Sequence, residues 1–165
     1  MGDISNPRRE RKPPTSVVAL ARTGSMTVAK LAATLIQVFE GCKLTSYWDS
    51  HGKVWTIGFG HTQGVTEGMK ITQEDAAHYL EIDSAPLIAL VKDKPLLEAA
   101  ALVSFGYNCG IGALKRVLSG EIQILHEEFM AGPTGYGETS GGVKLAGLLS
   151  RRQLEASLIE VSRGA

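Results

Sequence analysis

The sequence predicts an α+β fold in which a small antiparallel sheet lobe and a mainly helical lobe lie on either side of a cleft. Apolar residues recur every three or four positions over 27–39, which indicates one buried face of a helix. Strand-forming residues lie on both sides of a turn cluster within 44–59. The remainder is mostly helix-forming. A chain of 165 residues, 44% of them hydrophobic, can bury a sizeable core in one domain.

The first predicted helix ends next to a candidate catalytic carboxylate. Ser25 or Thr27 can cap its first turn, and Gly41 is suited to terminate it. Glu40 then lies in the last turn, beside Phe39. Apolar neighbours disfavour the charged form of a carboxyl group, which suits a general acid working near neutrality. The expected buried face of this helix consists of Val28, Leu31, Leu35 and either Val38 or Phe39.

The sheet lobe supplies a second carboxylate. Tyr47 and Trp48 favour one strand and residues 54–57 favour the next, with turn-forming residues between them. Asp49 therefore lies at a strand end in a polar setting, where we expect it to be ionised. Glycosidic bond cleavage uses such a pair of carboxyl groups in contrasting surroundings, and Thr56 adds a hydroxyl nearby. Taken singly, each of these residues also fits an ordinary role as a surface charge, a turn residue or a strand former.

The predicted helical lobe begins with a capped helix. Thr72 can cap residues 73 to about 92, with Asp75 in the capping-box position, and Pro86 should kink or break this helix. Further helices are expected at 96–105, within 113–130 (one or two helices) and at 147–162. The expected core face of the middle segment consists of Leu114, Val117, Leu118, Ile122, Leu125 and Phe129.

Charge divides the chain into a basic N-terminal arm, residues 1–26, and a catalytic domain, residues 27–165. The chain has 17 basic and 17 acidic residues, but residues 1–30 hold six basic residues against two acidic ones, a net of +4. A basic arm favours contact with an anionic surface or another protein, and a solvated arm explains the same charges equally well. Nucleic-acid binding is not expected, because no aromatic or motif pattern supports it.

Neither a secretion signal nor a transmembrane segment is predicted. The apolar stretch 17–21 has five residues, whereas a signal needs about 7 to 15. No apolar run approaches the length of about 18 residues that a membrane span requires. Cys42 and Cys109 form no close redox or metal motif, so we expect two buried thiols, with a disulfide as the alternative. No cofactor or metal is expected, because no zinc-like spacing and no phosphate-binding glycine loop is present.

Four motifs in order resemble the phage-type lysozymes, the endolysins of glycoside hydrolase family 24. The first motif comprises Phe39-Glu40-Gly41, Tyr47, Asp49, Gly52 and the run Trp-Thr-Ile-Gly-Phe-Gly-His-Thr at 55–62. The segments at 71–77, 102–110 and 145–155 resemble three helices of the same family. Together the motifs span about residues 27–160, so the resemblance implies a lysozyme-like fold for most of the chain.

The resemblance implies an enzyme, a muramidase that hydrolyses the β-1,4 bond between N-acetylmuramic acid and N-acetylglucosamine in peptidoglycan. Glu40 then takes the role of general acid, and Asp49 and Thr56 position the attacking water. The family is regarded as inverting, which requires room for water between the carboxylates. Six residues separate Asp49 from Thr56 where the family usually has five. We expect the extra residue in the turn at 51–53, which keeps Thr56 facing the cleft.

Other residues take supporting roles by the same resemblance. They are Tyr107 and Asn108 on the cleft floor as substrate-binding residues, Arg151 or Arg152 as a cation near the catalytic Glu, and His61 with Asp83 as a structural pair. A catalytic base is the alternative interpretation of His61. Residues 131–142 form a predicted loop where the family normally has a Trp-containing segment.

Two other functions fit parts of the sequence. A lytic transglycosylase cleaves the same glycan with one Glu and no attacking water, so the presence of both Asp49 and Thr56 argues against it. A virion-associated wall-binding protein could keep the fold without turnover. The resemblance also implies synthesis in the cytoplasm of a bacterial host and action on the cell wall after holin-type release or virion delivery. We expect a monomer unless the protein is carried on a virion.

Overall fold

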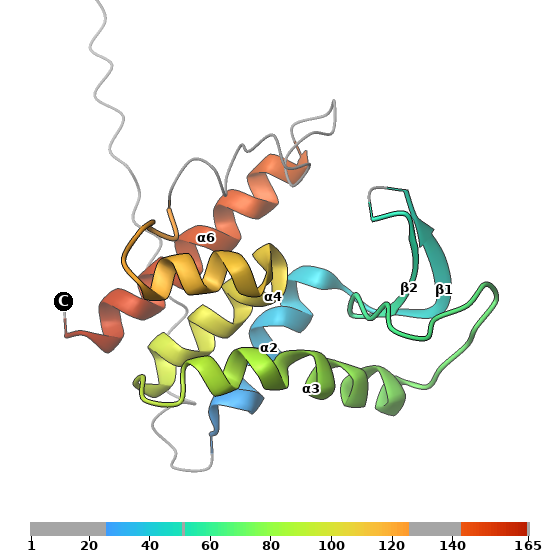
Figure 1. Ribbon diagram of the computed structural model, residues 1–165, viewed down its shortest axis with the longest axis horizontal. Helices are drawn as coiled ribbons and strands as arrows, with labels where there is room; N and C mark the ends of the chain where they lie inside the picture. The colour runs from blue at the N-terminus through green and yellow to red at the C-terminus, as the bar shows by residue number, and fades with distance from the viewer. Residues whose placement is uncertain (1–25, 51, 126–142, 165) are drawn as a thin grey trace, which may run out of the picture.

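A computed structural model describes residues 26–50, 52–125 and 143–164 of the protein. The described residues form four helices and one two-stranded antiparallel sheet. In Figure 1 the sheet stands to one side of α2, α4 and α6, and α3 extends below both lobes. This arrangement confirms the predicted α+β fold. The basic arm up to residue 25 and the loop at 131–142 lie outside the described residues.

Helix α2 (Val28–Glu40) confirms the first predicted helix and its stop signal. The Thr27 hydroxyl accepts a hydrogen bond from the Lys30 amide at 3.3 Å, and so caps the first turn. Gly41 ends the helix with a positive φ of 65°, a conformation that glycine adopts without steric cost. The helix buries Leu31, Ala32, Leu35 and Ile36, and it delivers Glu40 to the side of the sheet.

Strands β1 (Lys43–Asp49) and β2 (Val54–Gly58) form the sheet. Tyr47 pairs with Thr56, Trp48 with Trp55, and Asp49 with Val54. Regular pairing therefore continues to the last residue of β1, and the connection consists of residues 50–53. Between Asp49 and Thr56, only residues 50–53 lie outside the paired strands. The sequence predicts the extra residue in this same turn.

Helix α3 (Gln73–Leu90) begins with the predicted capping box. The Thr72 hydroxyl accepts from the Asp75 amide at 3.1 Å, and the Asp75 carboxylate accepts from the Thr72 amide at 2.8 Å. Of the predicted kink or break at Pro86, the break is wrong, because the helix continues through this residue to Leu90. Proline removes the hydrogen bond to the carbonyl of Ile82, and Ile82 is 47% exposed, so water can replace the missing donor.

Helix α4 (Leu96–Leu118) is the central helix and joins two segments that the sequence predicts separately. Gly110, at φ 88° and ψ 159°, is not helical, so α4 consists of two helical segments that meet at a kink. Beyond the helix Ile122 is buried as expected, whereas Leu125 is 43% exposed and its predicted core position is wrong. The residue lies in a turn, so helical periodicity does not place its side chain. Phe129 lies outside the described residues.

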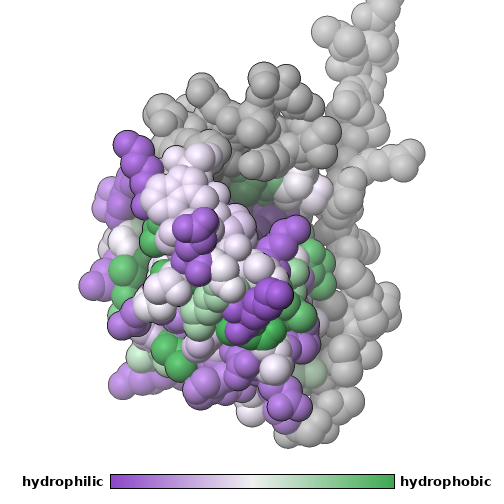
Figure 2. Space-filling model, turned by 90° about the vertical axis from the view of Figure 1, so that its right-hand side faces the viewer, coloured by the Kyte–Doolittle hydropathy of each residue, from purple (hydrophilic) through white to green (hydrophobic). Residues whose placement is uncertain are grey.

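The core of the helical lobe forms around α4. Helix α6 (Val143–Ser162), α2 and α3 all pack against it, as Figure 1 shows. Among the described residues, α4 is the one helix long and apolar enough to cross a membrane, but half of that apolar window is buried inside the fold. Its buried residues include Ala99, Ala100, Leu102, Val103 and Phe105, so packing explains its apolar composition. Figure 2 looks onto the sheet-lobe end, where hydrophilic and hydrophobic residues alternate over the surface.

A buried carboxylate at the start of α4 links stability to pH. Glu98 is 4% exposed and accepts from Arg163 at 2.9 Å, with Lys94 at 3.1 Å. The hydrogen bond from Arg163, followed by the Lys94 interactions, holds the pKa of Glu98 below its usual 4.5 despite burial. A depressed carboxyl pKa stabilises the fold above the unfolded-state value, and this stability is lost as pH falls through the folded-state value.

The replacement Arg163→Gln tests this linkage. The Arg163 side chain is 64% exposed, so we expect a loss of about 1 kcal/mol or less near pH 7. The difference from the parent should shrink as pH falls below 4.5, because protonated Glu98 no longer benefits from the guanidinium. Thermal unfolding from pH 7 down to pH 3 measures this. Arg116→Gln, which breaks the exposed pair with Glu121, is the matched control; a constant difference at every pH for Arg163→Gln contradicts the linkage.

Candidate active site

Glu40 forms an ion pair with a buried arginine. Its Oε1 accepts a hydrogen bond from Nη1 of Arg151 at 2.5 Å, and the Arg151 guanidinium lies 5.2 Å from the centre of the Phe39 ring. Arg151 is 2% exposed, whereas the Glu40 side chain keeps 25% of its surface accessible. Glu40 therefore lies beside Phe39 in the last turn of its helix, and one of the two arginines predicted near it forms the ion pair.

Arg151 is itself fixed by a buried polar network. Its Nε donates to Glu155 at 3.1 Å, and its Nη2 donates to the Ser104 carbonyl at 2.8 Å. Glu155 is fully buried, accepts from the Ser104 hydroxyl at 2.7 Å, and lies 3.0 Å from Nη1 of Arg152. Burial raises the pKa of Glu155, and the charges of Arg152 and Arg151 oppose this rise. Two guanidinium groups thus balance two carboxylates, of which Glu40 is the one that reaches solvent.

Sequence reasoning assigned no role to Glu155 or Ser104. The spacing of Arg151, Arg152 and Glu155 at three and four residues on one helix is a signal for ion pairing that could have identified the carboxylate. Ser104 offers no such signal, because it lies within an apolar run of α4. Its role follows only from the packing of α6 against α4.

Arg152 shares Glu155 with Arg151, but its other partners are different. Its Nη2 donates to Oδ1 of Asn108 at 2.7 Å, and its Nη1 lies 3.4 Å from the Cys109 sulfur. Of the two predicted alternatives, Arg151 is therefore the cation beside Glu40. Cys109 and Cys42 are both half-buried free thiols, and burial raises the pKa of Cys109 to about 11. The Cys109 thiol is protonated at neutral pH and poorly suited to react.

One face of the sheet brings three polar side chains together. Side chains alternate along a strand, so Tyr47 and Asp49 share a face of β1, and the pairing places Thr56 on the same face. Thr56 is 4% exposed, and its hydroxyl donates to the Val54 carbonyl at 3.4 Å, which is long for a hydroxyl donor. Trp48 and Trp55 occupy the opposite face with ring centres 5.6 Å apart.

The polar face of the sheet lies toward Glu40. Burial raises the pKa of Tyr47, and the negative charges of Asp49 and Glu40 raise it further. Both carboxylates are therefore close enough to act electrostatically on one phenol. The structure places Asp49 and Thr56 on one face of the sheet, and Glu40 at the end of the helix that precedes β1.

Gly52 leaves room for the carboxylate of Asp49. A Cβ atom at position 52 would lie 2.9 Å from Oδ2 of Asp49 and 3.3 Å from a Val54 methyl group. Gly52→Ala should therefore displace the end of the Asp49 side chain while the strands stay paired. Misplacement of a reacting group by about 1 Å can cost up to about 10²-fold. The role that the sequence predicts for Asp49 therefore leads us to expect a loss of about 10- to 100-fold in activity.

Activity and melting temperature of Gly52→Ala measure this effect together. The matched control is Gly112→Ala in α4, where an added Cβ meets no atom within 4 Å. Full activity of Gly52→Ala would show that the position of Asp49 is not critical. A large drop in melting temperature would instead place the damage in the strands.

His61 connects the loop after β2 to helix α3. Its Nδ1 lies 2.9 Å from Oδ2 of Asp83, and its Nε2 lies 2.9 Å from the Gln63 carbonyl. The ring stacks on Tyr79 at 4.2 Å, and the residue is 6% exposed. Both ring nitrogens are thus occupied inside the protein, which leaves little freedom for proton exchange with a substrate.

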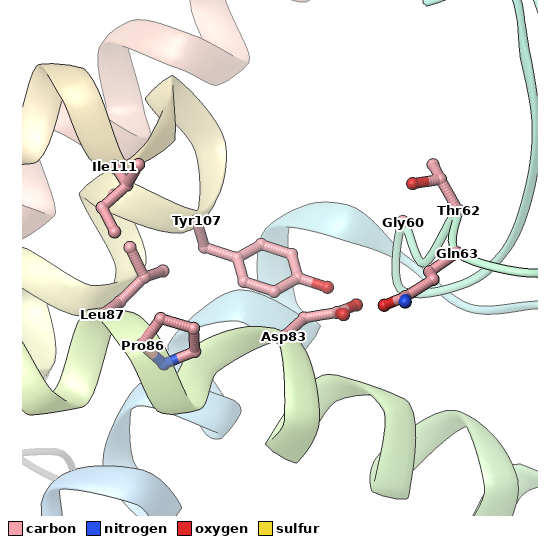
Figure 3. A pocket seen from close by; sticks show the side chains of 9 residues that line it. Gly60, Thr62, Gln63, Asp83, Pro86, Leu87, Tyr107 and Ile111 are labelled. Carbon is pink, nitrogen blue, oxygen red and sulfur yellow. The ribbon is translucent and has the colours of Figure 1, made fainter.

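A pocket of about 420 Å³ lies between the loop after β2, α3 and α4. In Figure 3 Tyr107 extends from α4 toward this loop, with Asp83 below it and Gln63 opposite. The Tyr107 hydroxyl donates to the Phe59 carbonyl at 3.1 Å, and burial raises its pKa well above the usual value. Pro86, Leu87 and Ile111 supply an apolar side to the pocket. Asn108 does not line it and instead binds Arg152.

No three His, Cys, Asp or Glu side chains of the described segments converge as metal ligands. The polar groups of the site are instead carboxylates, hydroxyls and guanidinium groups. These groups suit proton transfer and hydrogen bonding to a sugar.

Phage endolysins are among the known proteins that are similar to this chain. The endolysin of Lactococcus phage c2 is 40% identical over 143 residues, which are 81% of this chain and 60% of that protein. The endolysin of Acyrthosiphon pisum secondary endosymbiont phage 1 is 33% identical over 147 residues, which are 82% of this chain and 99% of that protein. The chain thus spans about 60% of the length of the Lactococcus phage relative.

Solved structures share the fold. The muramidase domain of SpmX from Asticaccaulis excentricus is 31% identical with a TM-score of 0.60, covering 81% of this chain and 97% of that chain. The endolysin from Escherichia coli O157:H7 phage FAHEc1 is 32% identical with a TM-score of 0.57, covering 82% and 94%. The family model for phage lysozyme matches residues 37–155, from the end of α2 to Glu155. The chain therefore belongs to the phage lysozyme family.

Proposed function

We propose that the protein is a muramidase that hydrolyses the β-1,4 bond between N-acetylmuramic acid and N-acetylglucosamine in peptidoglycan. The observation that supports this proposal is that Asp49 and Thr56 share one face of the sheet, while Glu40 ends the helix that precedes β1. Two carboxyl groups on separate rigid elements can act on opposite sides of a sugar ring. Relatives named as endolysins and a neighbour titled as a muramidase domain support the same activity.

Glu40 acts as the general acid in this proposal. The leaving oxygen needs a proton, and the Glu40 side chain, which keeps 25% of its surface accessible, can reach a bound glycan. The hydrogen bond from Arg151 holds this side chain in place. Arg151 is itself held by Glu155 and the Ser104 carbonyl, so its position does not depend on Glu40 alone.

Asp49 and Thr56 position the attacking water. A carboxylate at the end of β1 can accept one hydrogen of the water and support positive charge on the sugar. The Thr56 hydroxyl donates only a long hydrogen bond to the Val54 carbonyl, so its oxygen is free to accept the second hydrogen of the water. Attack from the sheet side, with protonation from the Glu40 side, inverts the anomeric centre.

The pocket beside Tyr107 is proposed to hold part of the glycan strand. Its polar side, with Thr62, Gln63 and Asp83, can hydrogen-bond sugar hydroxyl or amide groups, and its apolar side can contact a sugar face. His61 and Asp83 support the loop that forms this wall. Asn108 belongs, in this proposal, to the support of Arg152 and not to the substrate contacts.

Product analysis tests the proposed function. Purified peptidoglycan is digested and the fragments are analysed by mass spectrometry after borohydride reduction. A muramidase gives new reducing ends on muramic acid, and the first-formed anomer by proton NMR should be inverted. Anhydromuramic ends identify a lytic transglycosylase, the alternative activity. Absence of any cleavage supports the wall-binding alternative.

Delivery and partners are further parts of the proposal. The protein would be made in the cytoplasm of a bacterial host, reach the wall after holin-type release or on a virion, and act there as a monomer unless carried on a virion. The basic arm, residues 1–26, is proposed to contact an anionic surface or another protein. The reason is its charge, since six of the residues within 1–30 are basic.

A further inference from the structure

Tyr47 lies on the sheet face that carries Asp49 and Thr56. Packing within the protein explains neither the exposure of its side chain nor the orientation of its hydroxyl group. It is 43% exposed, although it pairs directly with the buried Thr56 across the sheet. Alternation along β1 places it on the face of Asp49 and opposite to that of Trp48. No described residue forms a hydrogen bond with its hydroxyl group. An exposed phenol in this position has its donor available to a bound molecule.

The surroundings of Tyr47 determine whether its hydroxyl group carries a proton. Burial and the charges of Asp49 and Glu40 raise the pKa of Tyr47, so the phenol keeps its proton throughout the neutral range. A neutral tyrosine donates one hydrogen bond and presents an aromatic face to a sugar ring.

We propose that Tyr47 is a substrate-binding residue of the catalytic centre, whose hydroxyl donates a hydrogen bond to the sugar held between Glu40 and Asp49. This inference rests on the proposed function and deepens it. The bond orients the sugar toward the water held by Asp49 and Thr56. Tyr47 does not exchange a proton with the substrate. Its hydroxyl group donates this hydrogen bond throughout the reaction. The bond affects only the sugars on either side of the cleaved bond.

The replacement Tyr47→Phe tests the inference because it removes only the hydroxyl group. We expect kcat on peptide-free glycan strands to fall about tenfold, the effect of one hydrogen bond to the reacting sugar, with KM changed less than twofold. The melting temperature should match the parent, because the phenyl ring is retained. The acid and alkaline limbs of the pH–rate profile should stay in place, because the donor does not titrate there.

Trp48→Phe is the matched control, since Trp48 is 51% exposed on the same strand but lies on the opposite face. It should keep the parent kcat and KM. An unchanged kcat for Tyr47→Phe overturns the inference. A shift of either limb of the pH–rate profile also overturns it, because Tyr47 would then act through the carboxylates. If the parent protein produces no new reducing ends on muramic acid, the proposed function itself fails, and the two failures are thus distinguished.

Discussion

Replacement of Glu40 by Gln is expected to lower the rate of peptidoglycan hydrolysis by about 10²- to 10⁴-fold, the usual contribution of a general acid. An amide occupies the same space as the carboxyl group but cannot protonate the leaving oxygen. The rate of release of reducing ends from purified peptidoglycan measures the effect. A variant that cleaves as fast as the parent refutes the role of Glu40.

The same replacement also has a structural consequence. Glu40 is one of two carboxylates that balance Arg151 and Arg152, so the amide leaves an excess of positive charge in the network. Because Glu40 is 25% exposed, we expect a loss between about 1 kcal/mol, typical of exposed pairs, and about 3 kcal/mol, typical of buried ones. Glu67→Gln is the control, since Glu67 is exposed and should keep both activity and stability.

Glu155→Gln is expected to have the largest effect on stability. Glu155 is fully buried and contacts both guanidinium groups and the Ser104 hydroxyl. Removing one member of a buried ion pair costs about 3–5 kcal/mol, because the remaining charges stay desolvated and unpaired. Urea unfolding, with the midpoint and slope fitted separately, measures this loss.

The control for Glu155→Gln lies one turn further along α6. Glu160 is exposed on the same helix, so Glu160→Gln should change the free energy of unfolding by no more than about 0.5 kcal/mol. Equal stabilities of the two variants would mean that the buried network contributes little. A stable Glu155→Gln variant with low activity would assign Glu155 to the support of Arg151 and Glu40 in catalysis.

Local features of the fold follow from the sequence because their partners are neighbours in the chain. The cap at Thr27, the stop at Gly41 and the capping box of Thr72 with Asp75 each involve groups within a few residues. The strand pair is local in the same sense, since β1 and β2 are joined by a short turn. The break at Pro86 does not occur, because the exposed turn around Ile82 lets water replace the missing donor. The prediction for Leu125 is wrong because the residue lies in a turn, where helical periodicity does not place its side chain.

By itself, the sequence determined the order of elements, the α+β fold class and the two carboxylates carried by the end of α2 and the end of β1. Only the tertiary structure decided the surroundings of those groups. Arg151 meets Glu40 across 111 positions, and Glu155 meets Ser104 across 51. These contacts exist because α6 and α2 both pack against α4. Helix periodicity predicts which face of a helix is buried, but it does not specify which residue of another helix lies against that face.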